Sequence, residues 1–255
     1  MNPRPLQGVF AAAVTPLLDD FSPDADRIPE LLSFLAVRGC HGALILGTTG
    51  EGPSFSPLER RAIFAAAARV REVQPEFVLL GGTGTPSLQE TVELNRTAFE
   101  LGFDGVVVLP PYYYRNAPEE GLLAWFTEVI RQSVPTGGAL LGYHIPAVSG
   151  VPITINLLRS LSDRFPRQFA GLKDSSGDAD HALALGQEFS PSLAVFNGND
   201  SLFNLALTTG AAGCITAPAN LISPMLRRMW DSAGDAPRRD EIEGEIEVAR
   251  RILDG

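Results

Sequence analysis

Lys173 is the one lysine among the twenty lysine and arginine residues of this chain, and it ends the apolar run from Phe169. A cation at the protein surface can be either a lysine or an arginine. Only lysine can lose its proton and attack a carbonyl, because guanidinium stays charged and is not a nucleophile. A lysine left by chance at the surface of an arginine-rich protein is the plain alternative. Lys173 is therefore a candidate for amine chemistry, and the rest of the sequence must decide.

All four tyrosines fall in two short clusters, Tyr112 to Tyr114 and Tyr143. An apolar interior destabilises an ammonium, so a buried lysine can hold a lowered pKa and form an imine with a ketone. The protonated imine draws electrons, and a carbon–carbon bond one position beyond the adjacent carbon can then break or form. A phenol that faces the imine can move the proton that this step needs. Thr48 and Thr49, in a glycine-flanked turn, offer hydroxyl and backbone N–H groups to a carboxylate.

The three histidines do not predict a metal site. We expect His41 at the start of one strand, His144 at the end of another and His181 inside a helix. A metal-dependent enzyme needs clustered ligands, and these positions are not expected to converge. Two interpretations of His144, substrate contact and packing, stay open, and we expect structural roles for Glu51 and Asp174.

Short apolar runs alternate with longer helical stretches eight times. The runs are continuous rather than strictly alternating, which is typical of parallel strands covered on both faces. They cover residues 8–16, 43–47, 77–82, 105–109, 139–143, 169–173, 193–197 and 213–217. Helix starts are also recognisable: Ser56, Pro57 and Glu59 form a capping box with proline at the first helical position.

Eight strand–helix units predict an α/β fold, a (β/α)8 TIM barrel. A doubly wound sheet is the alternative, but the glycine-rich stretch 81–84 lacks the dinucleotide-binding spacing. We expect one domain over residues 1–255, with the barrel at about 8–234 and a shortened C-terminal extension, a helix at about 236–254. Barrel active sites form where strands end, and the candidate residues gather at those positions.

Composition excludes several classes of protein. The net charge of −10 and the pI near 4.8 argue against binding to nucleic acid. No run of about 18 apolar residues suggests a membrane span, and no signal peptide is recognised at the N-terminus. Cys40 and Cys214 lie far apart and are expected to be buried thiols. A cytoplasmic location is the expectation.

Three segments resemble signatures of the dihydrodipicolinate synthase / N-acetylneuraminate lyase family: residues 47–51, 143–146 and 171–174. Members of this family are class I, Schiff-base, pyruvate-dependent aldolases built on (β/α)8 barrels. The resemblance implies that Lys173 forms the imine with pyruvate, that Tyr143 is the acid/base, and that no cofactor or metal takes part. It implies that Thr48 links Tyr143 to Tyr113 of a neighbouring subunit in a homo-oligomer, a dimer or tetramer. Which of the tyrosines 112–114 takes that role stays open. The implied substrate-binding residues are Thr49, Gly50, Asn197, Gly198, Asp200 and Ile215.

Two departures from the family pattern bear on the substrate. Dihydrodipicolinate synthases carry an arginine where this chain has Val148, and valine cannot replace a bidentate cation. Neuraminate lyases usually carry a glutamate where this chain has Ser201. The motifs are closest to 2-keto-3-deoxygluconate-type aldolases, so cleavage of a 2-keto-3-deoxy sugar acid to pyruvate and an aldehyde is expected. A 4-hydroxy-tetrahydrodipicolinate synthase, a related dehydratase and a non-catalytic 2-oxo acid-binding barrel are the alternatives.

Overall fold

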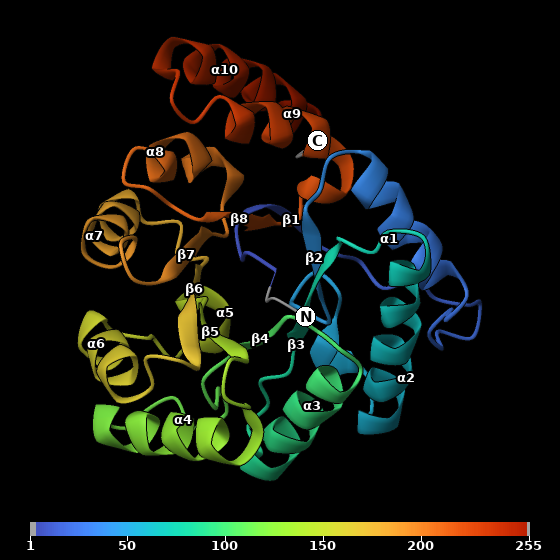
Figure 1. The fold of residues 1–255 in the computed structure, drawn as a ribbon, viewed down its shortest axis with the longest axis vertical. Helices are drawn as coiled ribbons and strands as arrows, with labels where there is room; N and C mark the ends of the chain where they lie inside the picture. The colour runs from blue at the N-terminus through green and yellow to red at the C-terminus, as the bar shows by residue number, and fades with distance from the viewer. Residues whose placement is uncertain (1–3, 254–255) are drawn as a thin grey trace.

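A computed structural model describes residues 4–253. Eight parallel strands close into a barrel in which each strand pairs with its neighbour in sequence and β8 pairs with β1. The helices form a ring around it (Figure 1). The predicted (β/α)8 barrel is confirmed. Its strands are β1 Gly8–Ala12, β2 Gly42–Ile45, β3 Val78–Gly82, β4 Gly105–Val108, β5 Ala139–His144, β6 Phe169–Asp174, β7 Ala194–Asn197 and β8 Gly213–Thr216.

At least one helix follows each strand, and two helices follow β5 and β8. They are α1 Arg27–Val37, α2 Pro57–Ala68, α3 Leu88–Glu100, α4 Glu119–Ser133, the short α5 Pro146–Ser149, α6 Ile155–Arg164, α7 Ala179–Phe189, α8 Phe203–Leu207, α9 Ala219–Asp231 and α10 Ala236–Leu253. The 3-10 turns η1 Gly52–Ser54, η2 Arg69–Glu72 and η3 Asp200–Leu202 lie between them. The capping box expected at the start of α2 is confirmed: the Ser56 side chain accepts from the Glu59 N–H, and the Glu59 side chain accepts from the Ser56 N–H.

Successive side chains of each strand point to opposite faces, so the barrel wall divides the core in two. The inner set fills the barrel, as expected for an eight-stranded core. The outer set packs under the helices. Phe10 and Phe196 meet inside with ring centroids 5.2 Å apart. The other buried members of the inner set are Ala12, Leu44, Val78, Leu80, Val107, Leu141, Tyr143 and Ile215.

The C-terminal helix α10 lies beside α9 and α8 (Figure 1). Its buried residue Arg239 donates from Nε to the Asn204 side-chain oxygen at 2.8 Å. Asn204 in turn donates to Asp240 at 3.0 Å. Near the other end of the helix, Arg250 forms an ion pair with Asp200, with Nε 3.4 Å from the carboxylate. Polar contacts therefore fasten α10 to the segment that follows β7. Within residues 4–253, no helix combines the length and the apolar character needed to cross a membrane.

Candidate active site

Lys173 points into the barrel near the C-terminal end of β6 and is 3% exposed. The register of β5 and β6 places Tyr143 directly beside it. The Lys173 Nζ lies 4.1 Å from the centroid of the Tyr143 ring. The electron-rich face of the ring attracts the ammonium in this partly desolvated position. The lysine and the tyrosine singled out from the sequence are therefore in direct contact.

The Tyr143 phenol lies close to the hydroxyl of Thr48, with the two oxygens 3.1 Å apart. Burial raises the pKa of Tyr143. The positive charge of Lys173 and hydrogen bonds with Thr48, Lys173 and Ser175 outweigh that effect, so the pKa lies below the ordinary tyrosine value. A phenol with a lowered pKa gives up its proton more readily near neutral pH, which suits a group that must both accept and return one.

A tight turn after β2 presents Thr48 and Thr49. Thr15 donates from its hydroxyl to the Gly50 carbonyl at 2.7 Å. A Cβ added at Gly50 would lie 2.7 Å from the Ala13 carbonyl oxygen, so only glycine fits there. Glu51 has a φ of 55°, a left-handed conformation that is uncommon for residues other than glycine. The turn is thus held in one shape, with Thr48 exposed at the barrel mouth and Thr49 half-buried.

A cavity of about 320 Å³ opens beside the Tyr143 phenol, over the ends of β2 to β5. Arg60, which the sequence interpretation missed, lines it. Its guanidinium is buried and donates to the Phe55 carbonyl at 3.0 Å and to Glu90 at 3.2 Å. The polar lining consists of Thr48, Glu51, Ser54, Arg60, Thr83, Tyr112, Tyr143 and Ser149, and the main apolar lining consists of Leu44, Leu46, Pro53, Val107, Leu109 and Val148.

The tyrosine cluster after β4 divides between the cavity and the solvent. Tyr112 lines the cavity. Tyr113 is 76% exposed, and Tyr114 packs against it with ring centroids 5.3 Å apart. Tyr113 therefore does not line the cavity of its own chain.

The predicted residues of β7 and β8 are arranged differently from the lysine–tyrosine pair. Asn197 accepts the backbone N–H of Asn199 at 2.9 Å, so its side chain holds the loop. Asp200 is buried and engaged by Arg250. Ile215 lies in the inner set, and Gly198 packs against Ser175. Among the described residues, none of these four lines the cavity beside Tyr143, and neither do Lys173, Thr49 and Gly50.

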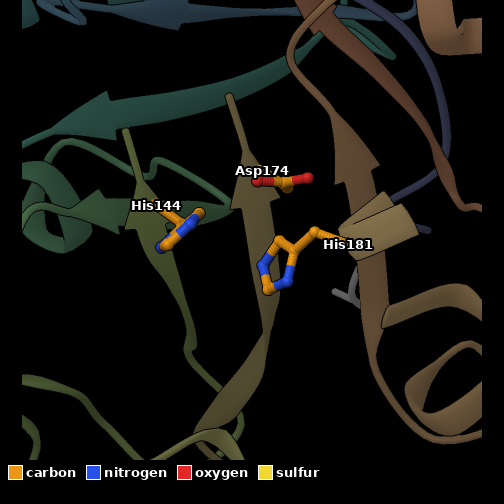
Figure 2. Close-up of side chains that lie close together, drawn as sticks. All are labelled: His144, Asp174 and His181. Atoms are coloured by element: carbon orange, nitrogen blue, oxygen red, sulfur yellow. The ribbon is translucent and has the colours of Figure 1, made fainter. Parts of the chain in front are cut away.

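His144, Asp174 and His181 come together on the outer side of the barrel wall (Figure 2). A potential ligand atom from each lies within 4.8 Å of those from the other two. The rings of the two histidines have centroids 4.9 Å apart. The expectation that the three histidines do not converge was wrong for His144 and His181, because His181 lies in the first turn of α7, near the ends of β5 and β6. His41 packs against Trp230 and is not part of this cluster. His144 alternates with Tyr143 along the strand, so it packs outside the barrel instead of touching the cavity.

The hydrogen bonds of His144 argue against a metal at this cluster. Its Nδ1 accepts the backbone N–H of Ile153 at 3.0 Å. Because an amide N–H only donates, the neutral ring keeps its hydrogen on Nε2. A metal-bound imidazole needs the opposite arrangement, with the second nitrogen donating. Burial lowers the pKa of His144, Asp174 raises it and His181 lowers it, with a net lowering. The cluster is thus a packed junction behind the site.

A closed (β/α)8 barrel with a buried lysine against a tyrosine phenol at its C-terminal rim defines an enzyme built for lysine-imine chemistry. The sequence model described as the Dihydrodipicolinate synthetase family matches residues 5–247. The chain belongs to this family, whose members are lyases that form a Schiff base with pyruvate.

Individual relatives agree with this assignment. The chain is 40% identical over 228 residues to an uncharacterized DapA-like lyase of Chloroflexus aurantiacus, covering 89% of this chain and 74% of that protein. Dihydrodipicolinate synthase from Aquifex aeolicus superposes with a TM-score of 0.88 at 26% identity, covering 97% of this chain and 82% of that one. A prophage protein of the same family from E. coli K12, solved in complex with pyruvate, gives a TM-score of 0.86 at 26% identity, covering 93% and 79%.

Proposed function

We propose that the chain reversibly cleaves a 2-keto-3-deoxy sugar acid to pyruvate and an aldehyde. The observation that carries the proposal is the contact between Lys173 Nζ and the Tyr143 ring, 4.1 Å from its centroid, beside a phenol that is paired with Thr48. This contact places an amine that can form an imine next to a group that can carry a proton. The E. coli relative solved with pyruvate supports pyruvate as the shared product.

The proposed reaction assigns one role to each group. Neutral Lys173 attacks the C2 carbonyl of the substrate, water leaves, and a protonated imine forms. The Tyr143 phenolate takes the proton of the C4 hydroxyl, the C3–C4 bond breaks, and the electron pair passes into an enamine as the aldehyde departs. Tyr143 then returns its proton to C3, and water hydrolyses the imine to pyruvate and free Lys173. Thr49 and the backbone of Gly50 hold the carboxylate.

We assign Tyr113 to the site of a neighbouring copy in a homo-oligomer. Its 76% exposure supports this, because a large aromatic side chain presented to solvent beside a site is suited to an interface. In this role it approaches Thr48, which is itself exposed at the mouth. Tyr112, which lines the cavity of its own chain, is the alternative for this task.

The cavity supports a substrate with hydroxyl groups. Among the described residues, the Thr83 hydroxyl oxygen is buried without a hydrogen-bond partner, and it lines the cavity. An unpaired buried hydroxyl costs free energy that a substrate hydroxyl would recover. Ser54 adds a further hydroxyl, whereas the Ser149 hydroxyl is already engaged by the backbone of Val151. Val148, the position where dihydrodipicolinate synthases carry an arginine, also lines the cavity.

One observation favours a second candidate, condensation of pyruvate with an aldehyde that carries a carboxylate. Arg60 is the one cationic side chain among the described residues lining the cavity, and it is buried. The relative from Aquifex aeolicus is named a dihydrodipicolinate synthase. Arg60 is already paired with Glu90. Because of this pairing, condensation with an aldehyde that carries a carboxylate is the weaker candidate function.

Borohydride trapping tests the shared chemistry. Incubation with pyruvate and borohydride should add a pyruvyl-derived mass at Lys173, and Lys173→Arg should abolish it. Labelling of Lys173→Arg elsewhere, or no labelling of the wild type, would refute the proposal. A panel of aldehydes with pyruvate, followed by product mass, separates the candidates: glyceraldehyde should be preferred over aspartate semialdehyde. Dependence of an aspartate semialdehyde reaction on Arg60, tested with Arg60→Leu, would favour the second one.

The cellular location stays a prediction. Cys40 and Cys214 are buried free thiols, a state that suits the reducing cytoplasm expected from the sequence.

A further inference from the structure

A second cavity lies at the end of the barrel where the strands begin, opposite the rim that carries the lysine–tyrosine pair. Its volume is about 410 Å³, and it lies between the segment 4–7, which leads into β1, and the residues just before β2 and β3. Active sites of such barrels form at the other rim. A ligand in this second cavity would therefore not be the substrate of the proposed reaction.

His41 is held in a fixed position in the wall of this cavity. Its Nδ1 accepts the backbone N–H of Val9 at 3.0 Å, and the Trp230 ring packs against it with centroids 6.3 Å apart. Gly8, with a φ of 107°, makes room for the ring, because a Cβ there would lie 2.4 Å from His41 Nδ1. Since an amide N–H only donates, the neutral imidazole carries its hydrogen on Nε2. The ring therefore has an N–H donor that the bond to Val9 leaves unused.

Arg4 supplies a second donor to the same cavity. Its Nη1 donates to the Asp104 carboxylate at 3.0 Å, and its Nη2 donates to the Pro75 carbonyl at 2.6 Å. The remaining nitrogen, Nε, is buried, and among the described residues it has no hydrogen-bond partner. An unpaired buried N–H costs free energy that a bound acceptor would recover. The short segment from Pro75 to Val78 connects the two donors, because the Val78 N–H donates to the His41 carbonyl at 3.0 Å.

The charges around Arg4 favour an anion. Asp104 is also paired with Arg71, so one carboxylate serves two guanidinium groups and one positive charge is left over. All three side chains are mostly buried, and a charge interacts more strongly there than in water. Glu76 is the one acidic side chain among the described residues that line the cavity. It is exposed to solvent, where its opposing charge is screened.

We propose that this cavity binds a small carboxylate, which accepts hydrogen bonds from Arg4 Nε and His41 Nε2. Hydrogen bonds to an ionised acceptor are stronger than those between neutral groups, so a carboxylate fits these two donors better than a neutral carbonyl does. Gln7 and Gln74 also line the cavity, and their amides suit polar groups on the rest of the ligand. The inference does not rest on the proposed function, because among the described residues the two cavities share no lining residue.

The test is NMR of the histidine ring signals, with acetate, lactate and succinate as probes at constant ionic strength. None of these carboxylates has a ketone, so none can form an imine with Lys173. The chain has three histidines, and His41→Gln identifies the His41 signal by its loss. That signal should shift in a saturable way as a probe is added, while the signals of His144 and His181 stay in place. No shift of the His41 signal with any of the three probes would overturn the inference.

Two substitutions with opposite expected effects test the assigned contacts. Arg4→Lys keeps a positive charge beside Asp104 but removes Nε, so the Kd of the probe should rise roughly ten- to a hundredfold. Glu76→Gln removes the opposing charge at the rim, so the Kd should fall about two- to fivefold. Arg131→Lys, at an exposed position of α4, is the matched control and should keep the wild-type Kd.

An unchanged Kd in Arg4→Lys would overturn the inference, and so would an unchanged or higher Kd in Glu76→Gln. Before any probe is added, Arg4→Lys should show the wild-type signals of His144 and His181. If these signals differ, the substitution has altered the fold, and Glu76→Gln, which changes an exposed side chain, decides the question alone.

Discussion

Lys173 and Tyr143 lie on neighbouring strands with the ammonium nitrogen 4.1 Å from the centroid of the phenol ring. The positive charge of the lysine lowers the pKa of the phenol against the effect of burial. A protonated imine keeps a positive charge at the same point of the barrel. The phenol therefore keeps this electrostatic support from the free enzyme through the covalent intermediate.

Tyr143→Phe should separate imine formation from turnover. The variant keeps the ring beside Lys173 and loses only the hydroxyl, so pyruvate should still be trapped by borohydride. Turnover should fall roughly 10²- to 10⁴-fold, the usual cost of losing an essential proton-transfer group. Steady-state kinetics together with the mass of the trapped protein gives both values. Near-normal turnover would contradict the assignment of Tyr143.

Thr48→Val should move the pH dependence of turnover without removing pyruvate binding. The Thr48 hydroxyl lies 3.1 Å from the phenolic oxygen and lowers the pKa of Tyr143. Without it that pKa rises, so the limb of the profile that rises with pH moves to higher pH. Thr49→Val, on the adjacent residue, is the matched control and should raise the KM for pyruvate at an unchanged profile. A pH shift in the control of the same size would remove the distinction between the two threonines.

Gly198→Ala should destabilise the fold at the end of β6. The added Cβ would lie 2.0 Å from the Ser175 hydroxyl oxygen and 2.8 Å from the Asp174 carbonyl oxygen, so both groups must shift. The free energy of unfolding, measured by chemical denaturation, should fall by about 1–3 kcal/mol, the usual cost of overpacking. Gly244→Ala is the control, because nothing lies within 4 Å of a Cβ there. It sits inside helix α10, where alanine should stabilise the fold by about 0.5–1 kcal/mol. A wild-type stability of Gly198→Ala would contradict this prediction.

His144→Phe should destabilise the protein by about 1–3 kcal/mol, because it leaves the buried Ile153 N–H without a partner. Chemical denaturation gives this value. His181→Leu, which removes the neighbouring ring, is the control. Among the described residues the His181 Nε2 has no hydrogen-bond partner, so loss of this ring should lower the free energy of unfolding much less. Equal losses in both variants would show that packing, not the hydrogen bond, dominates.

The pKa of His144 also predicts a pH dependence of stability. In the folded chain it lies below the ordinary value of 6.5, so the ring is neutral where the unfolded chain begins to take up a proton. The contribution of His144 to the free energy of unfolding is therefore complete above about pH 6.5 and is lost as the pH falls through the lowered folded value. His144→Phe should lose less stability than the wild type over that interval. Parallel curves for the two proteins would contradict this.

The barrel and its central pair were predictable because the rule behind them is geometric. Parallel strands of a closed barrel end at one rim, so residues that end different strands must meet there. Lys173, Tyr143 and Thr48 needed nothing more than their positions at strand ends. The helix start at Ser56 followed in the same way from local hydrogen bonding.

The side-chain partners were less predictable. Continuous apolar runs do not show which residues point inward, so Asn197, next to the inward Phe196, was expected to face a substrate. Asp200 is engaged by Arg250 of α10, and no local pattern indicates a partner fifty residues away. Arg60 reaches the cavity from a helix, outside the strand-end rule.

The burial of the only lysine also affects how the enzyme tolerates its own chemistry. Free aldehydes condense with exposed amines, and a lyase that releases one does so next to its own surface. Here every other side-chain cation is an arginine, whose guanidinium does not form such imines. An aldehyde leaving the rim therefore meets no lysine on the outside of the molecule. Among the side chains, imine formation with such an aldehyde is therefore confined to Lys173, where the adduct belongs to the reaction itself.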